Sequence, residues 1–348
     1  MKYDKFFSDD VASFMHSPVR EIFKKVDLAS IYSFAGGYPD AATFPIDDIR
    51  RISAEVLEKY GAKALQYGAT QGVPELRAVV AERCGVAVEN VQITTSSQQG
   101  IDVCTRVLVN PGDVVLTTAP TYLGALQSFK SYRADIRTIG DYDFSKKPKF
   151  CYVIPDFQNP SGETMTLEER RKLVALAREH DFLIVEDSPY RELRYSGEPV
   201  PTIYSLAPEL LDQIYVCKQS LDLCPPVFDQ YIAAEFMGSG ALDANLQKSI
   251  ALYRAKRDKM LALLEQYMPA GVSWTHPEGG LFLFVTLPEG FDTVALYDRA
   301  LSAGVAYVAG SFFYPDGSHR NTMRVNFSFL DASRMEAGVK LLAEVVGQ

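Results

Sequence analysis

Short apolar runs alternate with amphipathic segments over the first two thirds of the chain. The apolar runs predict strands at residues 90–97, 113–120, 149–155, 182–190 and 213–218. Helical spacing of apolar positions predicts helices over residues 72–84, 98–109, 121–132 and 166–181. Apolar strands that alternate with helices favour an α/β fold, in which helices cover both faces of a mainly parallel sheet. We therefore expect a three-layer αβα sandwich.

The pattern changes near residue 241. A long helix that mixes basic and apolar residues is predicted over 245–267, followed by apolar runs at 279–288 and 322–329 with a helix near 292–303 between them. This order indicates a second, smaller α+β layer. We expect three parts: an N-terminal arm at 1–44 that joins the small domain, a large domain at 45–240, and the small C-terminal domain at 241–348.

Charge and cysteine usage exclude several classes of protein. The chain has 348 residues, with 35 Lys and Arg against 44 Asp and Glu, for a formal net charge of −9. An acidic chain without a basic block is poorly suited to nucleic acid or to an anionic membrane. Its longest apolar runs are shorter than 18 residues, so no bilayer span is predicted.

The metal-ligating residue types are scattered. Five Cys and four His lie far apart, without a CxxC pair or a Cys/His cluster, so neither a metal site nor a disulfide framework is indicated. The polar start of the chain has no signal-peptide core. These features predict a cytoplasmic protein.

Polar side chains gather where predicted strands end, which is where parallel sheets bind ligands. Ser97 and Gln98 begin a helix, whose free N–H groups suit a phosphate, although a plain N-cap is the simpler interpretation. Asp187 could hold a protonated ring nitrogen or be a solvated acid. Asn159 could donate to a ring oxygen or merely form an Asn-Pro turn, and Tyr122 could stack on a flat ligand or fill the core.

Arg324 alternates with apolar neighbours in the run NTMRVNFS. A lone Arg on a half-buried strand suggests a bidentate clamp for a carboxylate, with a structural ion pair as the alternative. Together these residues offer a phosphate seat, a stacking ring, an amide, an acid and a carboxylate clamp.

The chain resembles the class I/II aminotransferases, which depend on pyridoxal 5'-phosphate and have fold type I, and especially the branch with 2-aminoadipate and kynurenine aminotransferases. The resemblance covers nearly the whole chain in family order. It rests on the stretches SPVREI, FAGGYPDAATFP, ALQYGATQGVPELR, ITTSSQQGIDV, NPGDVVLTTAPTYLGALQSF, FCYVIPDFQNPSG, FLIVEDSPYRELRYSGEPVPT, HPEGGLFLFVTLP and AYVAGSFFYPDG…NTMRVNFS.

The resemblance implies a role for each matching residue, and makes the large domain the cofactor-binding one. The cofactor residues are then Ser97 and Gln98 at the phosphate, Tyr122 on the ring face, Asn159 and Tyr190 at the ring hydroxyl, Asp187 at the ring nitrogen, and Tyr67 at the phosphate of the neighbouring subunit. Arg324 would bind the substrate α-carboxylate, with Gly37 lining the pocket and Arg20 on an arm above it. The resemblance further implies a homodimer that acts on amino acids and 2-oxo acids.

One departure from the family decides the chemistry. The family carries a lysine after a strand, in a motif S-[FL]-S-K, which forms the Schiff base with the cofactor, and an Arg seven residues later for the phosphate. An ungapped alignment places Lys218-Gln219-Ser220-Leu221 at this motif and Phe228 at the Arg. A gapped alignment, which we prefer, matches KQSLDLCPPVFDQ to the later helix and loop, so that the lysine segment is missing. In both alignments Lys218 is the only weak candidate for the catalytic lysine.

Several functions therefore stay open. The chain could bind pyridoxal 5'-phosphate or pyridoxamine 5'-phosphate without a covalent bond, so that ordinary transamination is impaired. It could be a non-catalytic binding or regulatory homologue, or the cleft could serve different chemistry. If the gene encodes a segment that this sequence lacks, the protein is an ordinary aminotransferase.

Overall fold

The computed structural model describes residues 6, 31–204, 218 and 220–347, and divides the chain into two compact units. The first unit comprises the described residues of Met1–Asp40, Val109–Ala207 and Ile250–Gln348. The second comprises those of Ala41–Leu108 and Pro208–Ser249. The parts predicted at 1–44, 45–240 and 241–348 rest on the sequence pattern, whereas the two units are defined by their compactness. The predicted division therefore stays a prediction.

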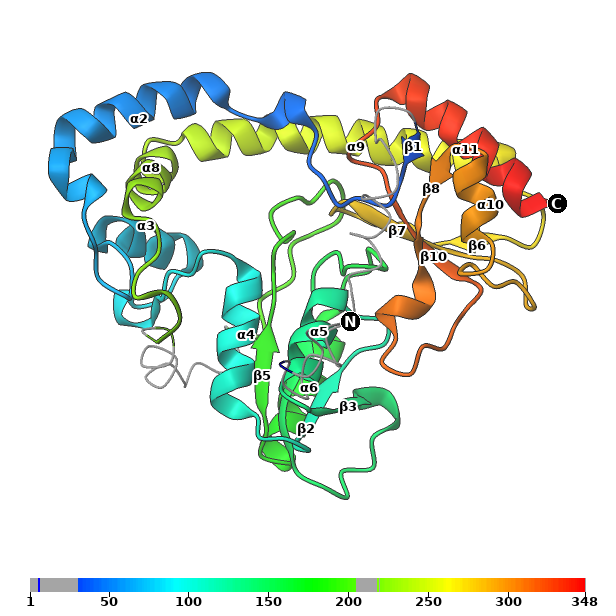
Figure 1. Ribbon diagram of the computed structural model, residues 1–348, viewed down its shortest axis with the longest axis horizontal. Helices are drawn as coiled ribbons and strands as arrows, with labels where there is room; N and C mark the ends of the chain where they lie inside the picture. The colour runs from blue at the N-terminus through cyan, green and yellow to red at the C-terminus, as the bar shows by residue number, and fades with distance from the viewer. Residues whose placement is uncertain (1–5, 7–30, 205–217, 219, 348) are drawn as a thin grey trace. The chain divides into compact units, whose positions relative to one another are not determined.

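A parallel sheet lies in the first unit, with strand order β3-β2-β4-β5 (Figure 1). Its strands are β2 (Val114–Thr117), β3 (Asp135–Thr138), β4 (Pro148–Val153) and β5 (Leu183–Glu186), and every neighbouring pair is parallel. Side chains alternate between the two faces of β4. Phe150 and Tyr152 meet Phe129 of helix α5 (Leu123–Ser131), whereas Cys151 and Val153 belong to a core cluster with Leu173 of helix α6 (Leu167–Glu179). Helices thus cover both faces, as the sequence predicted.

Helix α6 begins where its sequence indicates. The Thr166 side chain accepts a hydrogen bond from the Glu169 backbone N–H, and the Glu169 carboxylate accepts one from the Thr166 N–H. This capping box satisfies two backbone donors that a helix otherwise leaves unpaired at its first turn.

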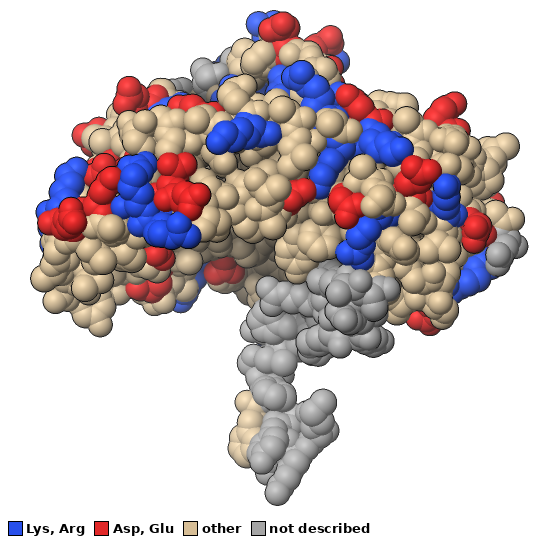
Figure 2. Space-filling model, turned by 90° about the horizontal axis from the view of Figure 1, so that it is seen from above, with Lys and Arg blue, Asp and Glu red and all other residues tan. Residues whose placement is uncertain are grey.

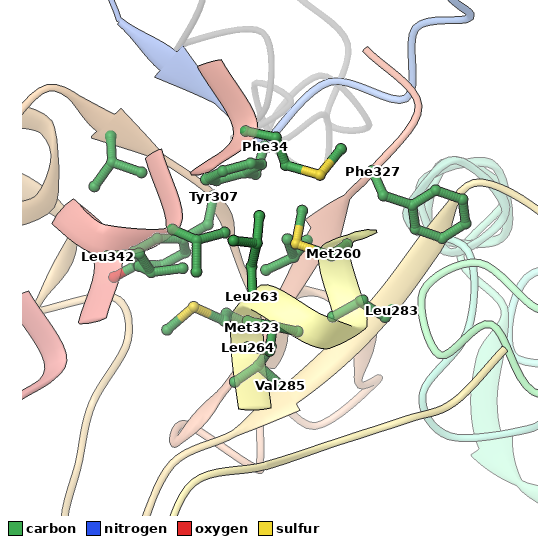
Figure 3. Packing of buried hydrophobic residues seen from close by; sticks show 14 of the residues in the cluster. Phe34, Met260, Leu263, Leu264, Leu283, Val285, Tyr307, Met323, Phe327 and Leu342 are labelled. Carbon is green, nitrogen blue, oxygen red and sulfur yellow. The ribbon is translucent and has the colours of Figure 1, made fainter. Parts of the chain in front are cut away.

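An antiparallel sheet with order β6-β7-β10-β9 forms the α+β part of the first unit. Its strands are β6 (Ser273–Trp274), β7 (Phe282–Thr286), β9 (Val308–Ala309) and β10 (Thr322–Asn326). Helix α10 (Tyr297–Ser302) lies between β7 and β9 in the chain, and helix α11 (Ala332–Gly347) follows β10. A short parallel pair joins β1 (Tyr32–Ser33) to β8 (Val305–Ala306). Buried side chains such as Met260, Leu264, Val285, Met323 and Leu342 make one core of helix α9 (Ala241–Tyr267), the sheet and α11 (Figure 3).

The second unit is helical. It contains α2 (Ile46–Tyr60), α3 (Pro74–Cys84), α4 (Ser97–Leu108) and α8 (Val227–Gly238). Its core includes Ile52 and Val56 of α2, Leu76 of α3, and Tyr231 and Ala234 of α8. Across both units, short 3₁₀ helices lie between the longer elements, at Ala41–Thr43 (η3), Gly61–Leu65 (η4), Val88–Asn90 (η5), Ile139–Asp141 (η6) and Gly310–Phe313 (η8).

One predicted strand is corrected by the structure, and a second lies almost wholly outside the described residues. Residues 91–96 form no strand, because their only backbone bond to a distant segment is from Ile93 N–H to the Gln71 carbonyl, and a ladder needs a succession of such bonds. Of the run predicted at 213–218, only Lys218 is described, and it is helical. The helix predicted near 292–303 is shorter and begins at Tyr297.

Charged side chains of both signs are interspersed on the face shown in Figure 2. Many are paired within one element or between neighbours, as are Arg51 with Glu55 on α2 and Lys340 with Glu336 on α11. Such exposed pairs contribute little to stability, about 0–1 kcal/mol each.

Candidate cofactor and carboxylate site

The carboxyl ends of β2, β4 and β5 meet at one edge of the parallel sheet, because these strands run side by side in the same direction. Tyr122 follows β2, Asn159 follows β4, and Asp187 directly follows β5 with Tyr190 three residues later. The structure therefore places these four predicted site residues in the same unit and at the same sheet edge, where ligands of parallel sheets bind.

Asp187 is held by both the backbone and a side chain of β4. Its N–H donates to the Val153 carbonyl at 2.9 Å, and its Oδ2 accepts a hydrogen bond of 2.6 Å from the hydroxyl of Tyr152. Burial raises the pKa of Asp187, and the hydrogen bond from Tyr152 partly opposes this rise. Asp187 is therefore not the solvated strand-end acid that was the alternative from sequence.

Asn159 and Tyr190 are connected to Arg324. The Asn159 Oδ1 accepts a hydrogen bond of 2.8 Å from Arg324 Nη1, which leaves the amide nitrogen of Asn159 as a donor. Burial raises the pKa of Tyr190 to about 12, while the positive charge of Arg324 and a hydrogen bond with Asn159 lower it. The three residues form one polar group, in which two donors, the amide and the phenol, lie next to a buried cation.

Arg324 is buried without an acidic partner among the described residues. It lies on β10 with 5% of its surface exposed, and its Nη2 donates to the Ala35 carbonyl at 2.7 Å. Its guanidinium stacks between the rings of Phe282 and Phe313, 4.3 and 5.2 Å from their centroids. Burial lowers the pKa of Arg324 to about 10, and its Nε has no hydrogen-bond partner. Arg324 thus forms no ion pair with an acid among the described residues, which favours the carboxylate clamp over the structural ion pair.

Gly37 lies against Phe282, one of the two rings that contact the Arg324 guanidinium. A Cβ at this position would be 2.8 Å from Cζ of Phe282, closer than side-chain carbons approach. The position therefore needs glycine as long as Phe282 keeps its place beneath the Arg324 guanidinium. The structure brings Gly37 near the clamp, as expected, whereas Arg20 lies outside the described residues.

Gln158 joins the loops that carry Tyr122 and Asn159, a role that the sequence did not reveal. Its Nε2 donates to Thr118 Oγ1 and to the Pro120 carbonyl, both at 2.8 Å, and its Oε1 accepts from Ser161 at 2.6 Å. A glutamine beside Asn-Pro resembles any turn residue in sequence, so only the structure shows that it ties the two strand ends together.

Arg170 and Asp156 form a fully buried ion pair behind the Asn159 loop. Arg170 Nη2 lies 2.9 Å from Asp156 Oδ1, and neither side chain is exposed to solvent. Arg170 also donates to the carbonyls of Pro155, Met165 and Pro201. This arginine on α6 thereby fixes the start of the loop.

The predicted phosphate residues lie in the second unit. Ser97 and Gln98 open helix α4, and the turn before them is braced by Gln99, whose Oε1 accepts from the Thr95 N–H at 2.8 Å. Gln99 Nε2 donates in turn to Asp222 Oδ2 at 2.8 Å. The geometry supplies the helix N-terminus that a phosphate requires.

Tyr67 lies in the second unit as well. It is 79% exposed in the single chain, and its N–H is bonded to the Gln66 side chain. A large aromatic side chain with this exposure is available for a contact outside its own chain.

Lys218 is fully buried and its amine is engaged by an acid. The Nζ lies 2.7 Å from Asp222 Oδ1, one helical turn away. Burial raises the pKa of Asp222, but the hydrogen bonds from Lys218 and Gln99 outweigh this effect and hold the pKa below its usual value. The lysine therefore neutralises Asp222 beside the start of α4.

Two searches of the described residues gave negative results. They contain no helix that is long and apolar enough to cross a membrane. They also contain no group of three or more His, Cys, Asp and Glu that could hold a metal ion.

A family model for class I and II aminotransferases matches residues 34–221, more than half of the chain. This chain belongs to the class I and II aminotransferase family. It is 40% identical to an aromatic-amino-acid aminotransferase 1 of Thermococcus litoralis, covering 99% of this chain and 95% of that protein. It is 31% identical to a 2-aminoadipate transaminase of Thermus thermophilus, covering 99% and 98%.

Solved structures agree with this assignment. A Pyrococcus horikoshii kynurenine aminotransferase, solved in complex with PMP, matches with a TM-score of 0.93 and 39% identity over 99% of this chain and 97% of that one. The α-aminoadipate aminotransferase LysN of Thermus thermophilus matches with a TM-score of 0.92 and 31% identity over 100% and 98%. The fold is therefore that of the fold-type-I aminotransferases, as the resemblance implied.

The residues present fit pyridoxal phosphate or pyridoxamine phosphate. Asp187 has one oxygen bonded to Tyr152, which leaves Oδ1 for a ring N–H, and Arg324 Nε is a buried donor without a partner. A cation buried without an anion is costly, so the site suits a ligand that brings a carboxylate.

Proposed function

We propose that this aminotransferase-family protein holds pyridoxal phosphate or pyridoxamine phosphate without a covalent bond, because it lacks the family's Schiff-base lysine. The observation that carries the proposal is the ion pair of Lys218, the only candidate for the Schiff-base lysine. Its amine is buried on a helical turn and paired with Asp222 at 2.7 Å, whereas a covalent attachment needs a neutral amine that is free to react.

The alignments with relatives support a missing segment. The alignment with the Thermococcus litoralis protein extends over 396 positions, whereas the whole chain has 348 residues, so at least 48 positions of that protein have no counterpart here. The match to the family model ends at residue 221, next to Lys218. Both findings fit the gapped alignment, in which the residues around the lysine are absent.

The proposed contacts are those that membership of the family implies for the matching residues. Asp187 would receive the ring N–H, Asn159 and Tyr190 would bond the ring hydroxyl oxygen, and Tyr122 would stack on the ring. From the second unit, Ser97 and Gln98 would bind the phosphate, with Tyr67 reaching the phosphate of a neighbouring subunit. When bound, the ring supplies an electron sink for the substrate α-carbon.

The substrate would be an amino acid or a 2-oxo acid. Arg324 would bind its carboxylate through Nε–H and the remaining in-plane N–H groups of the guanidinium, because Phe282 and Phe313 lie against its faces. Gly37 would line the pocket. Without the lysine, no side chain of the described residues has an evident role in moving the α-proton. Because such transfer typically contributes 10²–10⁴-fold to a rate, ordinary transamination would be strongly impaired.

We also propose that the protein is a homodimer in the cytoplasm. The second unit exposes Leu65 and Tyr67, two residues apart, at 72% and 79%, which supports a partner surface. The four described cysteines are free thiols, which suits a reducing compartment. We retain 1–44, 45–240 and 241–348 as the proposed functional division of the chain.

A comparison of two cofactor forms tests the proposal. Pyridoxal phosphate can bond covalently to a lysine and pyridoxamine phosphate cannot, so non-covalent binding predicts similar dissociation constants for both, within about tenfold. Both forms should also be removed by dialysis. Asp187→Asn should weaken both, and Lys218→Arg, which keeps the charge beside Asp222, should leave both unchanged.

Either of two results would reject this function. Pyridoxal phosphate that resists dialysis would indicate a covalent attachment, and no uptake of either form would favour the non-catalytic binding or regulatory homologue. A longer gene that encodes the missing positions would instead make the protein an ordinary aminotransferase.

A further inference from the structure

Tyr152 and Asp187 are placed together by the register of two parallel strands. Tyr152 of β4 is paired with Val185 of β5, and Asp187 lies two residues beyond Val185. Residues that pair across parallel strands, and those two apart along a strand, share a sheet face. Asp187 therefore projects on the face of Tyr152, about 6.6 Å further along, a distance that a tyrosine side chain spans.

The Tyr152 hydroxyl can only donate to this carboxylate. Its side chain is fully buried, with its ring packed edge-on against Phe129 of α5. Burial and the nearby charge of Asp187 raise the pKa of Tyr152 well above its usual value, so the phenol stays protonated. The 2.6 Å distance to Asp187 Oδ2 is that of a strong hydrogen bond to an ionised acceptor.

The other ionisable groups near this pair cannot replace the phenol. Tyr122, before α5, and Tyr190, after β5, interact electrostatically with it, and Arg324 on β10 interacts with those two tyrosines. Among the described residues, Asp187 is in no ion pair with a Lys or Arg, and its side chain accepts a hydrogen bond from Tyr152, which lowers the pKa that burial raises. The charge of Asp187 thus rests on a single donor.

We propose that Tyr152 is a positioning residue, whose hydroxyl keeps the half-buried Asp187 ionised and turns its Oδ1 toward the ring nitrogen of the cofactor. The part that concerns the ring nitrogen rests on the proposed function. The part that concerns Asp187 holds for the protein without cofactor. Tyr152 acts through Asp187 and touches no reacting atom.

Tyr152→Phe tests the proposal, because it removes one hydroxyl and keeps the buried ring. Tyr307→Phe is the matched control, since Tyr307, between β8 and β9, is equally buried and donates to the Thr293 carbonyl at 2.7 Å. The pKa of Asp187 is measured in the cofactor-free full chain by ¹³C NMR of labelled aspartate, with the Asp187 signal assigned by its loss in Asp187→Asn.

We expect Tyr152→Phe to raise the pKa of Asp187 by about one unit or more, the effect of a lost hydrogen bond to a charged group, and Tyr307→Phe to leave it unchanged. Cofactor binding needs the ionised acid and is lost as pH falls through this pKa. The acid limb of the binding curve should therefore move to higher pH by a similar amount in Tyr152→Phe only.

An unchanged pKa of Asp187 in Tyr152→Phe would overturn the proposal, as would equal effects of the two variants, which would show a merely structural role. A raised pKa of Asp187 with an unmoved acid limb would overturn the role toward the ring. If the wild-type chain takes up no cofactor, the proposed function fails, while the NMR measurement still decides whether Tyr152 keeps Asp187 ionised.

Discussion

Replacing Arg170 by methionine should destabilise the first unit by about 3–5 kcal/mol. Methionine fills part of the volume, but it leaves the Asp156 carboxylate buried with 0% exposure and without its bidentate partner. Breaking a buried ion pair in this way costs about 3–5 kcal/mol. The carbonyls of Pro155, Met165 and Pro201 also lose a donor. Arg194, whose Nη2 lies 3.5 Å from Asp156, offsets part of the loss.

The measurement is urea unfolding at pH 7, followed by the fluorescence of Trp274. This is the single tryptophan of the chain, and it lies in the same unit on β6. The unfolding midpoint should fall by about 1 M or more without a change of slope. Arg171→Met is the control, because Arg171 is the exposed neighbour on the same helix and should change stability by less than about 0.5 kcal/mol.

A second variant isolates the cause. Asp156→Asn combined with Arg170→Met removes the uncompensated charge and should recover at least about 1 kcal/mol relative to Arg170→Met alone. If Arg170→Met lowered stability no more than Arg171→Met does, the buried pair would not hold this region together, and the reasoning would be refuted.

Two further predictions concern the Arg324 clamp and the packing of Gly37 against Phe282. Arg324→Lys should weaken binding of a 2-oxo acid by about 100-fold in calorimetry, because lysine cannot contact Asn159, the Ala35 carbonyl and a carboxylate at once. Arg320→Lys, at an exposed position, should leave this affinity unchanged. An affinity of Arg324→Lys equal to that of the unsubstituted chain would contradict the clamp. Gly37→Ala should lower stability by about 1–3 kcal/mol, since its Cβ would meet Phe282 at 2.8 Å. Gly140→Ala, where nothing lies within 4 Å of the added Cβ, should be nearly neutral. Similar melting temperatures for Gly37→Ala and Gly140→Ala would argue against close packing of Gly37 on Phe282.

Local signals allowed parts of this fold to be predicted from sequence. The capping box at Thr166 and Glu169 marks the start of α6, because the two residues that form it are only three positions apart in the chain. The polar residues after β2, β4 and β5 were predicted to meet, since parallel strands bring their carboxyl ends together. The burial of Arg324 followed from its alternation with apolar neighbours on β10.

Other features depend on partners that are distant in sequence. Arg170 and Arg171 are adjacent and chemically identical, yet one is fully buried and the other exposed, and only Asp156, 14 residues away, explains the difference. The apolar run at 90–97 had strand-like residues, but none of the strands in the described part of the chain pairs with it. Tyr152 lies in an apolar run, and its partner Asp187 becomes visible only once the register of β4 and β5 is known.

Intact-mass spectrometry after borohydride reduction tests the central claim most directly. The full chain is saturated with pyridoxal phosphate, reduced, unfolded to release bound ligand, and weighed, with free pyridoxal phosphate at low concentration to limit attachment to exposed lysines. The account predicts the mass of the unmodified chain, because the amine of Lys218 is committed to Asp222. A stoichiometric adduct that maps to Lys218, or to any other single lysine, would contradict it.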